Sequence, residues 1–225
     1  LLEGEMNTDF DEGTVSFSAD GKTMFFTRCY TEKGESRGAQ ICTTTRSGGK
    51  WGKVTEVELS KDSSVTFAHP TLSPDGKYLY YVSDLAGGYG GKDIWRSERN
   101  GTQYGAPVNL GPSINTAGDE MFPYMRENGT LYFSSDGHPG FGGLDIFYAN
   151  EMEDGNWVVS NMMYPMNSNG DDFGISYISG VEKGMFSSNR GEKKGYDKLY
   201  DFELPEIEFI IEGKVKVNEK DNNGR

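Results

Sequence analysis

Acidic residues recur in pairs along this sequence, and paired carboxylates are the first feature that could do chemistry. The pairs are Asp11 with Glu12, Asp119 with Glu120, and Asp171 with Asp172. Two carboxylates that face each other across a channel can hydrolyse a glycosidic bond, one as the acid and the other as nucleophile or base. Catalysis needs different roles from its residues, yet these pairs occupy the same point of a repeat. We therefore interpret them as acceptors of hydrogen bonds from turn amides.

The chain has two histidines, His69 and His138. His69 precedes Pro70 in a segment that should form an innermost strand, where its ring can face a central channel; a structural role is favoured over a catalytic one. His138 lies in the turn HPGFGG, where we expect it to be solvated. The sequence has no G-x-S-x-G elbow of a serine hydrolase, so we predict no catalytic residue. His69 and the six acidic residues are our candidate binding residues, at the channel mouth and its loops.

Aspartates also bracket two glycine-rich loops, and oxygen ligands on loops suit calcium. The pairs are Asp84 with Asp93 and Asp136 with Asp145. The aspartates before Ile94 and Ile146 are equally well explained as turn caps, and the first repeat has Gln40 at that place. We predict neither a metal site nor a cofactor.

The two cysteines, Cys29 and Cys42, fall on segments that should be neighbouring strands of one sheet. They are either close enough for a disulfide or simply two small, half-buried residues. Zinc is not indicated, because no third or fourth ligand accompanies them.

A repeat must position all of these side chains. Gly38, Gly91, Gly143 and Gly195 lie 53, 52 and 52 residues apart. In each copy two short apolar segments flank a tight turn, such as Asp75-Gly76, which favours a hairpin because glycine accepts positive φ. A third segment follows the repeated glycine, and a fourth begins near Trp51, Tyr104 and Trp157. Four strands per unit, repeated in tandem, are typical of the blades of a β-propeller.

We therefore predict an all-β fold with a β-propeller over residues 1–204. Its four-stranded antiparallel blades should span about 10–59, 66–111, 118–161 and 171–204. The second strands are apolar at consecutive positions, as in 79–82, which indicates sheets covered on both faces. A sandwich or solenoid would also cover both faces, but the strict period favours the propeller.

The first and last segments of the sequence each lead to a further expectation. Residues 1–12 align without a gap on 109–120, so we expect four repeats to be part of a larger ring. After Pro205 an alternating apolar run leads into a polar stretch. We expect 205–225 to begin a separate, truncated β domain; the alternative is a strand that closes the ring.

Composition excludes some partners. The formal net charge is −13 and the isoelectric point is about 4.6, which disfavours nucleic acid. No stretch approaches the length of an apolar membrane span.

Several motifs together resemble a known family. SPDGKYLYYVSD, GGYGGKDIW, LYFSSDGHPGFGGLDIF and NLGPSINT resemble the TolB-like, WD-type propeller repeats of Gram-negative envelope proteins. Followed by IEGKVKV, they resemble a multidomain OmpA-family architecture of bacteria with type IX secretion. There the propeller precedes a carboxypeptidase-regulatory-like β-sandwich, which 205–225 would begin, and a peptidoglycan-binding domain. No catalytic residue is known in the family's propeller, so the resemblance implies none here.

The resemblance implies a non-enzymatic scaffolding propeller in the periplasm, associated with the outer membrane. Its partners would be envelope proteins, among them type IX secretion components, and a C-terminal domain would anchor the complex to peptidoglycan. The alternative is a glycan-binding or glycoside-hydrolysing propeller, in which acidic and aromatic residues hold a sugar in the channel.

Overall fold

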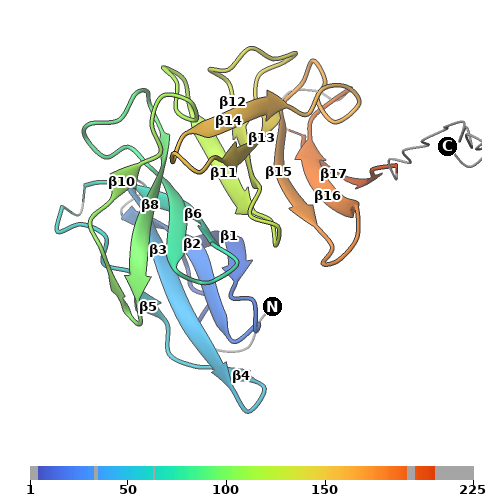
Figure 1. Cartoon of the computed structure of the whole chain (residues 1–225). Coiled ribbons are helices and arrows are strands. Elements are labelled where there is room, and N and C mark those ends of the chain that lie inside the picture. The colour runs from blue at the N-terminus through green and yellow to red at the C-terminus, as the bar shows by residue number, and fades with distance from the viewer. Residues whose placement is uncertain (1–4, 33–34, 63, 192–195, 206–225) are drawn as a thin grey trace, which may run out of the picture.

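The chain folds into four antiparallel sheets that follow one another in sequence order. The structure is a computed structural model and describes residues 5–32, 35–62, 64–191 and 196–205. All named elements are strands, and Figure 1 shows the four sheets side by side in an arc. The prediction of an all-β propeller is confirmed.

The first two blades each have three long strands and two short outer ones. Blade 1 contains β1 (Asp11–Phe17), β2 (Thr23–Glu32), β3 (Glu35–Ser47), β4 (Lys50–Trp51) and β5 (Thr55–Glu56). Blade 2 contains β6 (Phe67–Leu72), β7 (Tyr78–Ser83), β8 (Asp93–Asn100), β9 (Gln103–Tyr104) and β10 (Val108–Asn109).

The last two blades are simpler. Blade 3 contains β11 (Glu120–Met125), β12 (Leu131–Ser135), β13 (Asp145–Glu151) and β14 (Trp157–Asn161). Blade 4 contains β15 (Asp172–Tyr177), β16 (Lys183–Ser188) and β17 (Lys198–Glu203), which are its three strands among the described residues.

The outer strand departs from the sequence prediction in two blades. We expected one continuous fourth strand, but in blades 1 and 2 it is broken into two pieces that pair with β3 and β8. At the break, the amides of Gly52 and Gly105 donate to the carbonyls of Thr45 and Glu98 at 2.8 Å. In blade 3 the segment from Trp157 to Asn161 is one residue shorter than the matching segment from Tyr104 to Asn109, and it forms the continuous strand β14.

The hairpin turns between first and second strands form as their residues predict. In blade 2 the Ser73 hydroxyl donates to Asp75 at 2.6 Å, and the Lys77 amide donates to the same carboxylate at 3.0 Å. Gly76 then adopts φ +69°, which an L side chain rarely tolerates. The Ser18 and Asp20 side chains repeat the arrangement in blade 1.

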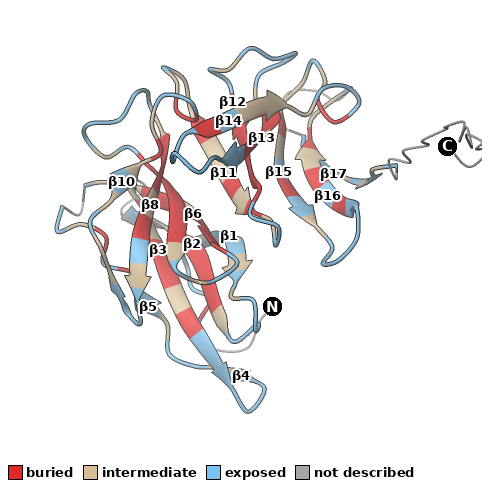
Figure 2. Cartoon of the chain, viewed as in Figure 1, coloured by how far each residue is buried: buried red, intermediate tan, exposed pale blue. Residues whose placement is uncertain are grey.

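The core lies between the blades. β7 is buried from Leu79 to Ser83 and β12 along its whole length, whereas β16 alternates because blade 4 is covered on one face among the described strands. Figure 2 shows this as red middle strands in blades 2 and 3 and mixed colours in blade 4. The continuous apolar runs thus mark strands sandwiched between neighbouring sheets.

The arc leaves its inner strands facing a common space. β1, β6, β11 and β15 lie next to one another in that order, and β15 does not pack against β1 (Figure 1). The described residues contain no helix that could cross a membrane.

Two remaining sequence interpretations concern the cysteines and the tail. Cys29 and Cys42 are both free, since Cys29 pairs with Ala39 across the sheet while Cys42 pairs with Phe26. The expected second β domain falls almost wholly on 206–225, which lie outside the described residues.

Candidate functional site

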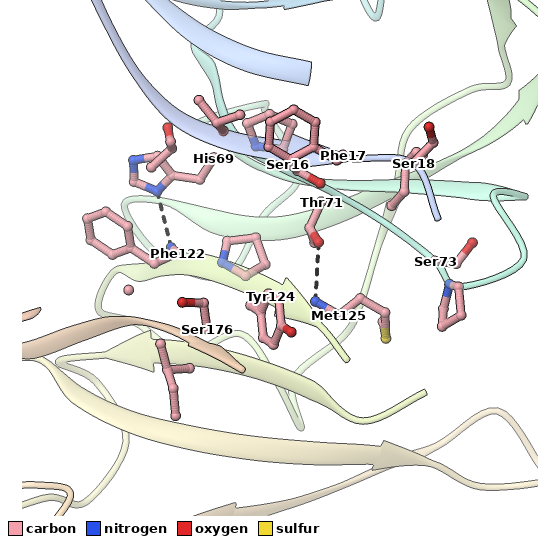
Figure 3. A pocket seen from close by; sticks show the side chains of 18 of the residues that line it. Ser16, Phe17, Ser18, His69, Thr71, Ser73, Phe122, Tyr124, Met125 and Ser176 are labelled. Atoms are coloured by element: carbon pink, nitrogen blue, oxygen red, sulfur yellow. Dashed lines mark hydrogen bonds between the residues drawn. The ribbon is translucent and has the colours of Figure 1, made fainter. Parts of the chain in front are cut away.

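The inner strands of all four blades line one hollow of about 760 Å³. It corresponds to the central channel of a propeller, and Figure 3 shows side chains from β1, β6, β11 and β15 converging on it. The lining is mainly apolar, with scattered hydroxyl groups such as those of Ser16, Thr71 and Ser176. Concave, largely apolar surfaces with a few polar groups are typical of binding sites.

A β-bulge interrupts every inner strand at the same point. The bulge residues are Thr14, His69, Phe122 and Gly174, with φ of 44°, 52°, 54° and 65°. Positive φ is uncommon for a β-branched or bulky residue, so the surrounding structure must enforce it. A bulge increases the local twist of its strand, and at His69 and Phe122 the amide donates to a side chain of the preceding blade. Because the bulge recurs in all four blades, we interpret it as a structural feature of the channel wall.

His69, the bulge residue of blade 2, connects three blades. Its amide donates to the Thr27 hydroxyl of blade 1 at 2.9 Å, and its Nδ1 accepts the Phe122 amide of blade 3 at 3.1 Å (Figure 3). Its ring stacks on the Phe122 ring at 4.2 Å. Because Nδ1 accepts, the neutral ring carries its proton on Nε2. Burial, with a smaller contribution from the charge of Lys92, lowers the pKa of His69 to about 4.

His69 lines the hollow, but the other side chains of the lining favour binding over proton transfer. Phe17 and Val15 are 52% and 50% exposed there, and Tyr124 adds a partly buried ring. Glu127 is the single carboxylate among the lining residues. Hydrolysis by a carboxylate pair requires two such groups across the scissile bond.

The first-strand acids, Glu12, Glu120 and Asp172, lie outside this lining and are engaged in hydrogen bonds. Glu120 is fully buried and accepts from the Thr116 amide at 2.7 Å, the Thr116 hydroxyl at 2.6 Å and the Ser135 hydroxyl at 2.6 Å. Asp172 repeats these contacts with Ser168 and Ser188 and adds Arg190 at 2.6 Å. In blade 1, Glu12 accepts from Thr8 and from Arg28 at 2.9 Å.

The preceding acids bind neighbouring backbone. Asp119 accepts the Lys92 amide at 2.8 Å, and Asp171 accepts the Leu144 amide at 3.1 Å. Each therefore ties the start of one blade to the glycine-rich loop of the blade before it. Asp11, at the equivalent position of blade 1, is exposed. The structure thus gathers the acids at one end of the blades, separate from His69, where most of them satisfy turn and loop donors.

Sequence reasoning missed two buried asparagines in the connections between blades. The Asn115 side chain accepts the Ile94 amide at 2.8 Å and donates to the Ile94 carbonyl at 3.0 Å. Asn167 does the same to Ile146 at 2.7 and 2.8 Å. A signal was present, because Asn115 and Asn167 occupy matching positions of NLGPSINT and YPMNSN.

His138 is a correction to the sequence interpretation. We expected a solvated turn residue, but its Nε2 lies 2.8 Å from the Ile114 carbonyl and its ring lies against Phe147 at 5.0 Å. The turn folds back onto the blade junction, so the imidazole is half-buried. A local turn motif does not reveal such a tertiary contact.

The glycine-rich loops show how their aspartates are used. Asp93 accepts the amides of Tyr89 and Gly90, and Asp145 accepts those of Phe141 and Gly142. This is the geometry of a turn cap. No group of metal-ligating side chains with the proximity of a metal site occurs among the described residues.

Comparison with known proteins identifies the fold. No protein-family model matches the sequence, and no curated protein matches it either. The chain is similar to TolB from Acinetobacter baumannii, with a TM-score of 0.54 and 13% identity over 86% of this chain and 41% of that structure. The fold is a TolB-like β-propeller.

Two hydrolases share the same architecture. A puromycin hydrolase has a TM-score of 0.53 at 14% identity, over 86% of this chain and 27% of its own. Prolyl oligopeptidase B from Galerina marginata has a TM-score of 0.52 at 16% identity, over 86% and 26%. This chain therefore spans well under half of each of these proteins, and at these identities the likeness concerns the fold alone.

Proposed function

We propose that this chain is a non-enzymatic, protein-binding propeller. The observation that carries the proposal is the lining of the hollow: exposed apolar side chains on rigid inner strands, with one carboxylate among the lining residues. Apolar and aromatic side chains fixed by a scaffold suit binding, because little side-chain freedom is lost on contact. The two histidine rings already have backbone partners, which leaves His69 with Nε2 and His138 with Nδ1 for any further contact.

We further propose its setting. The TolB-like fold and the motifs SPDGKYLYYVSD and NLGPSINT support a periplasmic, outer-membrane-associated protein. In this proposal the propeller holds a protein component of a type IX secretion complex. A peptidoglycan-binding domain elsewhere in the protein attaches that complex to the cell wall.

A glycan-binding or hydrolytic propeller is the second candidate. Two observations favour it: the propellers of known hydrolases share the fold, and Phe17 and Tyr124 offer rings on which a sugar could stack. Hydrolysis would need a second carboxylate or a nucleophile paired with a base. In the part of the chain that the structure describes, neither imidazole ring is hydrogen-bonded to a serine hydroxyl: Nδ1 of His69 accepts the Phe122 amide and Nε2 of His138 lies against the Ile114 carbonyl.

Affinity capture of the full-length protein from envelope extracts tests the first proposal. We expect type IX secretion or cell-wall components to be recovered with the intact protein. Recovery should fall when Phe17, which projects into the hollow, is replaced by serine, and should not change with Met152→Ser, an equally exposed residue of blade 3. Recovery of neither component would refute the proposed setting.

A glycan array and a hydrolysis screen on the purified chain test the second candidate. We expect neither binding nor turnover. Specific turnover of any glycan, lost in Glu127→Gln, would replace the scaffold proposal with an enzymatic one.

A further inference from the structure

Two loops of adjacent blades each present an exposed aromatic ring. Residues 84–92 join β7 to β8, and 136–144 join β12 to β13, so both loops lie at the end of the blades where the second strands finish (Figure 1). Tyr89 is 50% exposed and Phe141 is 49% exposed. The two residues are 52 positions apart and occupy the same point of the repeat.

The backbone under each ring is anchored to a buried carboxylate. The Tyr89 amide donates to Asp93 at 2.6 Å, and the Phe141 amide donates to Asp145 at 2.8 Å. Asp93 and Asp145 are 2% and 1% exposed. Hydrogen bonds to buried charged groups are among the stronger ones in proteins, so each ring stands on a fixed backbone.

Glycines around the rings hold the loops against the next blade. A Cβ on Gly90 would lie 2.2 Å from the Gly118 carbonyl oxygen, and one on Gly142 would lie 2.0 Å from that of Gly170. The Gly91 and Gly143 amides donate to those same two oxygens at 3.1 and 3.2 Å. The loops therefore have little room to move, and their glycines are required by close packing.

The exposed half of each ring adds nothing to this packing. A large aromatic side chain between glycines, on a loop fixed by its backbone, exposes apolar surface that the fold does not use. Rigid aromatic anchors are what dominate protein interfaces, because they bury much area at a small entropic cost.

The surroundings of the rings are acidic. Asp84 and Asp136 are exposed at the first positions of the two loops, and Asp119 and Asp171 are half-exposed in the connections between the blades. Lys92 lies 3.6 Å from Asp119 and offsets part of this charge. Anionic headgroups and phosphates would be repelled here, whereas a basic polypeptide would be attracted.

We propose that loops 84–92 and 136–144 form one docking surface for a protein segment that combines basic and apolar side chains. Tyr89 and Phe141 are its apolar anchors, and the aspartates beside them select the basic residues. The proposal rests on the proposed protein-binding function and places the contact on the loop end of blades 2 and 3, away from the hollow.

Selection from a phage-displayed library of random dodecapeptides on the whole chain, followed by anisotropy titration of the synthetic consensus peptide, tests this. We expect a consensus with lysine or arginine beside apolar residues. Tyr89→Ala and Phe141→Ala should each weaken binding about tenfold, and together about a hundredfold. Tyr89→Phe should retain affinity, as should Met152→Ala, which removes a 51% exposed side chain outside both loops.

The outcomes separate this surface from the broader function. Binding that survives the double variant but is lost in Phe17→Ser would overturn the docking surface while leaving a protein-binding propeller. Failure to select any peptide, or an acidic consensus, also overturns the surface, and envelope capture decides the broader function independently. Binding of a glycan or an anionic vesicle that depends on Tyr89 would overturn the protein partner. An unchanged unfolding temperature in each variant ensures that lost binding is not lost folding.

Discussion

The buried contacts that join two neighbouring blades form the seal of their junction. The junction between blades 1 and 2 has a different seal from the two junctions that follow it. At the later junctions a buried asparagine clamps the neighbouring strand, and a buried acid, Glu120 or Asp172, accepts several hydrogen bonds. At the first junction the matching positions are Asp62 and Phe67. Asp62 is exposed and its carboxylate accepts from the Ser64 amide and hydroxyl in its own turn, whereas Phe67 is 2% exposed.

At the first junction an apolar contact therefore takes the place of the buried acid. Phe67 packs edge-on against Tyr81 at 5.6 Å, in a cluster that also contains Phe25 and Trp95. A second hollow, of about 740 Å³, lies where the clamp is missing, with Phe10, Tyr30 and Glu56 among its lining residues. One blade geometry thus tolerates two kinds of seal: a buried network of polar hydrogen bonds or a packed aromatic cluster.

Removing the aromatic seal should have the largest effect. Phe67→Ala leaves a cavity between blades 1 and 2, and we expect the free energy of unfolding to fall by about 4 kcal/mol. Urea denaturation measures it, with Phe17→Ala as the control: Phe17 is 52% exposed, so its loss should cost less than about 1 kcal/mol. Equal losses in the two variants would contradict the assignment of the first junction to packing.

The polar seal should be nearly as sensitive. Asn167→Ala leaves the buried amide and carbonyl of Ile146 without their side-chain partner, and we expect a loss of about 3 kcal/mol. Asp62→Ala, at the matching position of the first junction, should change stability by less than about 0.5 kcal/mol because Asp62 is exposed. A large effect of Asp62→Ala would show that the junctions are sealed alike.

The strands and turns of the blades could be predicted from the sequence, whereas the bulges of the inner strands could not. The period of the repeat and turns such as Asp75-Gly76 determine the strands, because hairpin chemistry and strand burial are local or periodic properties. Positive φ at Thr14 and Phe122 could not be predicted, since neither a β-branched residue nor phenylalanine indicates it. The bulges, and hence the lining of the hollow, follow from contacts between blades that local sequence does not encode.

His69 links both kinds of junction and should make the fold sensitive to pH. Its pKa is about 4, below the ordinary 6.5, so the folded state favours the neutral ring. As pH falls from 6.5 towards 4, the unfolded chain binds a proton that the folded chain does not, and the free energy of unfolding should fall by up to about 3 kcal/mol.

His69→Asn isolates this contribution. Asparagine tolerates positive φ and its side-chain oxygen can accept the Phe122 amide, but it does not titrate in this range. Wild type and variant should be compared by urea denaturation from pH 7 to pH 4. We expect the variant to lose the part of the pH slope that lies below 6.5; parallel curves would exclude His69 as its source.

The smallest effect should come from an ion pair between blades 3 and 4, which contrasts with a contact between an arginine and an aromatic ring at the first junction. Arg126 of blade 3 binds Glu182 of blade 4 at 2.6 Å, whereas Arg99 of blade 2 lies over the Phe25 ring of blade 1 at 5.8 Å. Glu182 is about half exposed, so Glu182→Gln should cost about 0.5 kcal/mol in dilute buffer. Screening should remove most of that difference in 1 M NaCl. Phe25→Leu, which replaces the ring under Arg99, should show a loss that salt does not change, because packing rather than charge provides that contact. If salt altered both variants alike, the division of the junctions into polar and apolar seals would not extend to these two arginine contacts.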